Sequence, residues 1–321
     1  MRRICCFIVI YFLAFTTLTS ATVSIRIAVL KFGTVNWELE AIKRLKLDIK
    51  FGFQLEVKGV AGKQAAAILF QGNEADVIVS DWIWVARQNA AGKNFRFLPY
   101  SRQIGSVIVA PDSDVSSMID LVGKRIGIAG GPVDKNWLLM RAYGLQQYGI
   151  DLAVESEPVF GAPPLLSKFM ERGELDAIIT FWHFGAKLKA KGFRELLTMS
   201  DAARTLGIEK DVPLLGYVFH KAWAEEKPDL VNALASASRE AKEFLAQDEA
   251  IWSKLRPKMR AKTEETFEAL KAGFRAGIPT TYSIDKNTID KFFLTLAKLG
   301  GKKLVGNATS ADVEIFWPSG W

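Results

Sequence analysis

Short apolar runs alternate with amphipathic stretches along the first third of the chain. SIRIAVL (24–30) and FGFQLEV (51–57) are rich in β-branched and aromatic residues, which is typical of strands, and the Ala-rich AGKQAAAILFQG (61–72) is typical of a helix. The run DVIVS (76–80) predicts a third strand, and a helix is expected to begin near Trp82. Strands that alternate with helices of about ten to fifteen residues indicate βαβ units and a mostly parallel sheet.

The alternation starts afresh with the β-branched run IGSVIVAP (104–111). The elements expected after it are a strand within DLVGKRIGIAGG (120–131), a helix at 135–149, a strand at 155–159, a helix at 164–173 and the strand DAIITFW (176–182). The β-rich VPLLGYVFH (212–220) then returns the chain to the first unit. Beyond residue 221, Leu, Phe and Trp recur every three or four residues, which predicts helices that pack on the first unit.

This order predicts an α/β protein with two lobes. Lobe 1 is expected to comprise residues 22–104 together with 218–321, and lobe 2 residues 105–217. A chain of 321 residues that is 49% hydrophobic can fill more than one core, which supports the division. Two crossings between the lobes would form a two-stranded hinge that permits closure without separation.

Two phrases about a hundred residues apart repeat one local pattern. GNEADVIVSDW (72–82) and GELDAIITFW (173–182) each have a Gly, then an Asp, a short apolar strand and a Trp six positions after the Asp. Residues just past the carboxyl end of a strand in a parallel α/β sheet face the crevice where ligands bind. The repeat therefore predicts two sheets that face one another across a cleft.

The first twenty-one residues have the features of a secretory signal peptide. Arg2 and Arg3 precede an apolar run at 4–15, and small residues end the segment at Ala21, where cleavage is expected. A membrane anchor is the alternative, but the apolar run is short for a bilayer span. The mature protein is therefore expected in the periplasm.

Cysteine usage and charge narrow the function further. Cys5 and Cys6 both lie in the leader, so the mature chain is left without a disulfide, a zinc thiolate or a cysteine nucleophile. Loss of Arg2 and Arg3 lowers the formal net charge from +7 by two, to +5. Acidic residues accompany the remaining basic ones along amphipathic helices, so a solvated surface explains them better than nucleic-acid binding does.

The sequence offers little for catalysis. Its two histidines are His183 and His220, and it has no nucleophile elbow, no phosphate-binding Walker loop and no HExxH motif. His220 lies in an apolar run and is interpreted as structural, whereas His183 directly follows Trp182 at a strand end and is a candidate ligand contact. No cluster of Asp, Glu and His has the spacing of a metal site, and no cofactor is expected.

Aromatic and polar residues gather at the predicted strand ends. Trp37, Trp82 and Trp182 each follow a short strand, with core packing as the alternative interpretation. Ser80, Asp81, Asn36 and Thr180 stand beside them, as in a small-molecule pocket with apolar walls and few polar groups. The turn RIGIAGGPVDKNW (125–137) brings Gly130, Gly131, Asp134, Lys135 and Asn136 to a helix start, where they either hold a ligand or, as with an N-cap Asp134, complete the helix.

These phrases together resemble the periplasmic substrate-binding proteins of ABC transporters, in the nitrate, sulfonate, taurine and thiamine-pyrimidine-precursor (NMT1/THI5-like) group. The resemblance covers most of residues 24–219 and is carried by residues 27–38, GNEADVIVSD, DLVGKRIGIAGG and GELDAIITFW. It implies a type II periplasmic-binding-protein fold and a monomer that delivers solute to a membrane permease with its ATPase. Its implied ligand contacts are Thr34, Asn36, Trp37, Ser80, Asp81, Trp82, residues 130–136, Thr180 and Trp182.

The acidic residues suggest which ligand this chain takes. Asp81 and Asp134 place negative charge near the expected pocket, which disfavours an anion unless Lys135, Arg102 or the helix terminus offsets it. An aromatic, neutral or cationic ligand is therefore expected, and a metal chelate is an alternative. Two other function classes stay open: an enzyme of the pyrimidine-precursor-synthase type, which export and the missing cysteines disfavour, and a periplasmic sensor or scaffold module.

Overall fold

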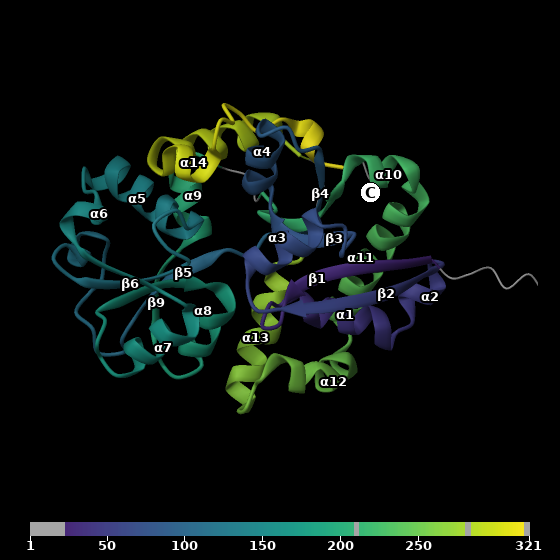
Figure 1. The fold of residues 1–321 in the computed structure, drawn as a ribbon. Helices are drawn as coiled ribbons and strands as arrows, with labels where there is room; N and C mark the ends of the chain where they lie inside the picture. Colours follow the sequence, from purple (N-terminus) through teal and green to yellow (C-terminus); the bar gives the residue numbers. More distant parts are fainter. Residues whose placement is uncertain (1–22, 209–211, 280–283, 318–321) are drawn as a thin grey trace, which may run out of the picture.

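The computed structural model describes residues 23–208, 212–279 and 284–317. The predicted signal peptide, residues 1–21, lies outside the described residues. Within these ranges the chain forms two five-stranded mixed sheets, which lie side by side with helices on both faces (Figure 1). The α/β class and the two lobes expected from the sequence are confirmed.

The first sheet has the strand order β2-β1-β3-β10-β4. Its strands are β1 (Val23–Leu30), β2 (Phe53–Val60), β3 (Val77–Asp81), β4 (Phe95–Ser101) and β10 (Leu215–His220). β1 runs parallel to β2 and β3, whereas β10 is antiparallel to β3 and β4. β10 begins a few residues before 218, the position predicted for the return to lobe 1.

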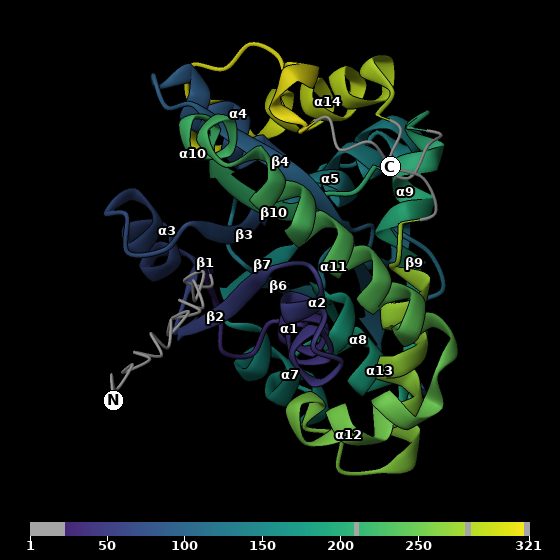
Figure 2. The same cartoon turned by 90° about the vertical axis from the view of Figure 1, so that its right-hand side faces the viewer.

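Helices cover both faces of this sheet. Alternate residues of β1 point to opposite faces, and apolar side chains on both faces are buried under helices. Ile27 lies in the core beneath α1, α11 and α12, and Ala28 lies in the core beneath α3 and α4. The helices on this lobe are α1 (Val35–Arg44), α2 (Leu47–Lys50), α3 (Lys63–Gln71), α4 (Trp82–Ala90), α10 (Lys221–Glu226), α11 (Pro228–Gln247), α12 (Glu249–Met259) and α13 (Glu264–Ala276). Figure 2 shows the long helix α11 crossing this lobe.

The second sheet has the order β7-β6-β8-β5-β9. Its strands are β5 (Gly105–Val109), β6 (Arg125–Ala129), β7 (Glu157–Gly161), β8 (Ala177–Phe181) and β9 (Arg194–Thr198). Its helices are α5 (Lys135–Tyr148), α6 (Leu152–Glu155), α7 (Pro163–Glu171), α8 (Trp182–Lys189) and α9 (Met199–Thr205). Strands β4 and β9 and the short helix α9 were not among the elements predicted from the sequence.

The two sheets repeat one design, and the repeated phrase marks equivalent strands. β3 and β8 each lie third in their sheet and run parallel to the second strand, β1 or β6. The repeated aspartates have the same role in the two sheets. Asp76 Oδ2 accepts a hydrogen bond from the backbone N–H of Arg26, and Asp176 Oδ2 accepts one from the backbone N–H of Arg125, each at 2.8 Å. They therefore fix strand register at the end of the sheet away from the cleft.

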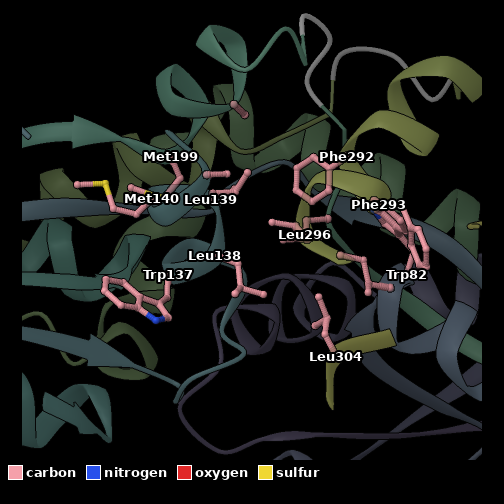
Figure 3. Packing of buried hydrophobic residues seen from close by; sticks show 14 of the residues in the cluster. Trp82, Trp137, Leu138, Leu139, Met140, Met199, Phe292, Phe293, Leu296 and Leu304 are labelled. Carbon is pink, nitrogen blue, oxygen red and sulfur yellow. The ribbon is translucent and has the colours of Figure 1, made fainter. Parts of the chain in front are cut away.

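The C-terminal helices do not all pack on the first lobe, in contrast to the expectation from the sequence. Helix α14 (Lys286–Val305) packs against α4 of lobe 1 and α5 of lobe 2, and α13 packs against α8 of lobe 2. Figure 3 shows Phe292 and Leu296 of α14 between Trp82 and Leu138. One hydrophobic cluster therefore runs through both lobes on this side of the molecule.

The described ranges contain no helix that is both long enough and apolar enough to cross a membrane.

Candidate functional site

A cavity of about 150 Å³ lies between the two sheets, at the carboxyl ends of β1, β3 and β8. Its walls are mostly apolar and aromatic, with a few charged and polar groups. Lobe 1 contributes Leu30, Phe32, Thr34, Lys63, Ser80, Asp81 and Tyr100; lobe 2 contributes Asp134, Lys135, Asn136, Phe181, Trp182 and His183; the crossing segments and the start of β10 contribute Gln103, Ile104, Leu214 and Leu215. The position agrees with the general location of ligand sites in open α/β sheets.

Asp81 and Lys135 join the two lobes across this cavity. Lys135 Nζ lies 2.8 Å from Asp81 Oδ2, and both side chains are largely buried. The other carboxylate oxygen, Oδ1, accepts a 2.8 Å hydrogen bond from the backbone N–H of Trp84 and so caps helix α4. Burial by itself would raise the pKa of Asp81, but Lys135 and Lys63 outweigh it and lower that pKa. Asp81 is therefore an anion whose oxygens already have partners.

The side chain of Asp134 also accepts a hydrogen bond from the backbone. Its side chain caps helix α5 by accepting a 2.9 Å hydrogen bond from the N–H of Asn136. Gly130 has a φ of +103°, and a Cβ there would lie 2.6 Å from Asp134 Oδ2, so the glycine makes room for the cap. Asn136 Oδ1 in turn accepts a 2.9 Å bond from the N–H of Gly105 at the start of β5. Burial raises the pKa of Asp134, although Lys63 and Lys135 act against the rise.

Lys63 is a cavity residue that sequence reasoning missed. It is the first residue of α3, and it forms no ion pair with any residue that the structure describes. Its ammonium reaches across to the second lobe, 5.9 Å from the centre of the Phe181 ring. The residue keeps solvent exposure, yet enclosure of the ammonium, together with the charge of Lys135, lowers its pKa. The sequence did contain a signal for this residue: Lys63 directly follows Gly62 at a helix start that has no capping side chain, which is a place where an anion can bind.

In the part of the chain that the structure describes, three helices begin at the cavity without a side-chain cap. These are α1 after Thr34, α3 after Gly62 and α8 after Phe181, whereas α4 and α5 carry the caps Asp81 and Asp134. The first N–H groups of a helix have no partner within the helix and carry partial positive charge. An anion in this cavity would therefore be favoured by three helix ends as well as by Lys63.

The structure separates the three tryptophans that the sequence grouped together. Trp182 lines the cavity, and Trp37 lies behind it with the ring centres 5.9 Å apart in an edge-on arrangement. Trp82 does not line the cavity: it is fully buried, 5.6 Å from the ring of Phe292 on α14 (Figure 3). Core packing, the alternative considered for these residues, is the environment of Trp82.

Several other candidates lie beside the cavity rather than on its wall. Asn36 donates to the carbonyl oxygens of Leu30 and Gly33, at 2.8 and 2.7 Å, and holds the turn after β1. Thr180 is fully buried, and the turn that contains Gly130 and Gly131 positions Asp134. The cavity thus brings together Thr34, Ser80, Asp81, Asp134, Lys135, Asn136, Trp182 and His183 from the predicted set.

His183 lines the cavity with both ring nitrogens buried and without a hydrogen-bond partner in the described structure. Burial, with a smaller effect from Lys187, lowers its pKa to about 3. It is therefore a neutral imidazole at physiological pH, able to donate one hydrogen bond and accept another.

Stability is expected to depend on pH through His183. The unfolded chain binds a proton at this residue near its ordinary pKa, whereas the folded protein does not until the pH approaches 3, so stability is present above the ordinary pKa and is lost as the pH falls. Urea denaturation should show a loss of roughly 1 kcal/mol between pH 6 and pH 5 from this residue alone. His183→Gln should remove that part of the dependence; an unchanged slope would contradict the assignment.

Solved structures of other proteins share this two-lobed arrangement. The periplasmic aliphatic sulphonate-binding protein SsuA from Escherichia coli has a TM-score of 0.73 at 16% identity, with 92% of both chains covered. The alkanesulfonate-binding protein SsuA from Xanthomonas axonopodis pv. citri, bound to MOPS, has a TM-score of 0.69 at 17% identity, with 92% of this chain and 98% of that one covered. A third structure, a DszB mutant in complex with biphenyl-2-sulfinic acid, has a TM-score of 0.61 at 14% identity, with coverage of 91% and 96%.

At these identities the solved structures show the fold, which is the two-lobed periplasmic-binding-protein fold that the sequence predicted. No curated protein sequence matches the chain. The family model described as NMT1/THI5 like matches residues 50–250, which is more than half of the chain. The chain therefore belongs to the NMT1/THI5-like family.

Proposed function

We propose that this chain is the exported solute-binding component of an ABC importer and that it encloses a small organic anion between its lobes. The observation that carries the anion is Lys63, a cavity cation without an ion-pair partner among the described residues. The solved structures of similar fold include proteins described as binding sulfonates in the periplasm. Export, a periplasmic location and the partnership with a permease and its ATPase are parts of the same proposal.

The charge of the ligand follows from how the acidic residues are used. The expectation of a neutral or cationic ligand rested on Asp81 and Asp134 as free negative charges. Both instead cap helices, and Asp81 also pairs with Lys135. What remains for a ligand is the ammonium of Lys63 and the uncapped ends of α1, α3 and α8. These groups favour an anionic head group such as a sulfonate or a carboxylate.

The rest of the ligand is proposed to be apolar, and an aromatic ring suits the walls. Phe32, Phe181, Trp182, Leu214 and Leu215 surround the space beyond the polar groups. Burial of an apolar body against them stabilises the complex by roughly 25 cal/mol per Å² removed from water. Contacts from both lobes would favour the closed arrangement, in which Asp81 and Lys135 meet.

The ligand class can be tested with probes of one shape and different charge. Mature protein should be titrated calorimetrically with benzenesulfonate, benzoate, benzyl alcohol and benzylamine. We expect the two anions to bind and the alcohol to bind more weakly. Preferential binding of benzylamine would refute the anion, and recovery of a chemically altered probe after incubation would favour the enzyme alternative.

Trp182→Ala is expected to weaken binding of benzenesulfonate about tenfold or more, because it removes the largest aromatic wall of the cavity. The measurement is the same titration, with tryptophan fluorescence as a second readout. Trp223→Ala, on α10 at a distance from the cavity lining, is the matched control and should leave the affinity unchanged. Equal effects of the two substitutions would mean that Trp182 does not contact the ligand.

A further inference from the structure

We infer that Gly273, a residue outside the cavity, determines how large a ligand the cavity accepts by positioning Trp182. The inference rests on the proposed function for its ligand and on packing for its mechanism. Gly273 lies in α13, which packs against α8 where Trp182 is the first residue (Figures 1 and 2). Residue 273 also lies beyond the part of the chain that the family model matches.

The ring of Trp182 occupies the space that a side chain at residue 273 would need. A Cβ at Gly273 would lie 2.6 Å from Trp182 Cζ3 and 2.8 Å from Cε3. These atoms belong to a rigid six-membered ring, so the ring would have to move as a unit. The missing side chain is thus a notch in α13 that receives the indole.

Other groups limit where the ring can go. Trp37 lies edge-on to it with centres 5.9 Å apart, and His183 lies on another side at 5.6 Å. Trp37 is itself fixed by Trp252 and Phe274, whose ring centres lie 6.3 and 5.9 Å away. The cavity is the open space beside Trp182, so a side chain at residue 273 would displace the indole into it.

Gly273 also holds a second lining residue. Its carbonyl oxygen accepts a 3.0 Å hydrogen bond from Gln103 Nε2, on the segment where the chain crosses between the lobes. One turn further along, a Cβ at Gly277 would collide with Gln103 Cγ. The end of α13 therefore shapes the cavity from outside, through Trp182 and Gln103 together, and Gly273 is a positioning residue with an expected effect on ligand size.

The test compares ligands that share a head group and differ in length. Ethanesulfonate, butanesulfonate and octanesulfonate should be titrated into the mature wild type, Gly273→Ala, Trp182→Phe and the double variant. We expect Gly273→Ala to lose about tenfold or more in affinity for octanesulfonate while affinity for ethanesulfonate is retained. Phenylalanine lacks the second ring that meets residue 273, so Gly273→Ala should have little effect when Trp182 is already Phe.

Two controls separate positioning from general damage. Ala272→Ser, on the exposed side of the same helix, should leave all three affinities unchanged. A uniform loss for all lengths in Gly273→Ala, or the same loss in the Trp182→Phe background, would overturn the inference. A crystal structure of Gly273→Ala decides the mechanism without a ligand: an indole shifted toward the cavity supports it, and an unmoved indole overturns it. Failure of the wild type to bind any probe, with a shifted indole, would reject the proposed sulfonate class but not the positioning.

Discussion

Lys63→Met is expected to weaken binding of benzenesulfonate about 100-fold, because a hydrogen bond to a charged group contributes roughly 1.5–3 kcal/mol and each 1.4 kcal/mol is tenfold in affinity. Removal of the ammonium also leaves Lys135 as the remaining lysine of the cavity lining, and Lys135 is paired with Asp81. Binding of benzyl alcohol, which has no charge, should change little. Isothermal titration calorimetry at one ionic strength measures both.

Two further variants make this result specific to Lys63. Lys298→Met makes the same charge change on an exposed position of α14, and its affinity should equal that of the wild type. Lys63→Arg keeps the charge and should retain part of the affinity. If Lys63→Met binds benzenesulfonate as tightly as the wild type, the ammonium is not the anion contact, and the helix ends by themselves would have to hold the head group.

Lys242→Met is expected to lower the free energy of unfolding by about 3–5 kcal/mol, the usual cost of leaving one charge of a buried ion pair without its partner. Lys242 Nζ lies 2.8 Å from Glu38 Oε2, and the side-chain exposures are 4% and 0%. The hydroxyls of Tyr217 and Ser238 donate to the other oxygen, Glu38 Oε1, at 2.7 and 2.6 Å. Without Lys242, a fully buried carboxylate keeps only neutral donors. Urea denaturation followed by circular dichroism gives the value.

The double variant Glu38→Gln with Lys242→Met tests whether the charges act as a pair. It removes both charges and keeps an oxygen that Tyr217 and Ser238 can donate to, so we expect it to be more stable than Lys242→Met by itself. A double variant less stable than either single one would show that the two residues act independently.

This buried pair also supports the cavity wall. Lys242 Nζ lies 4.9 Å from the centre of the Tyr100 ring, and Tyr100 lines the cavity. The polar network thus runs from the core of lobe 1 to the cavity wall. Its partners come from residues 38, 100, 217, 238 and 242, and no local pattern in the sequence connects them.

Trp82 and Trp182 show what the repeated sequence pattern could predict and what it could not. The pattern correctly placed both at the ends of equivalent strands, β3 and β8. Their surroundings differ because different distant helices cover them. Phe292 of α14 seals Trp82 into the core, whereas Trp182 meets the notch at Gly273 of α13 and keeps one side on the cavity. Equivalent positions in two sheets therefore have different roles.

The sequence by itself determined the α/β class, the two lobes, the equivalence of β3 and β8, and the interpretation of Asp134 as an N-cap that stood beside ligand binding. These follow from short-range rules, since apolar periodicity and capping act over a few residues. The tertiary structure alone decided that α14 joins the lobes, that Lys63 faces Phe181, that Glu38 pairs with Lys242 and that Gly273 receives Trp182. Each of these contacts joins residues far apart in the chain, and packing brings them together only when the whole chain has folded.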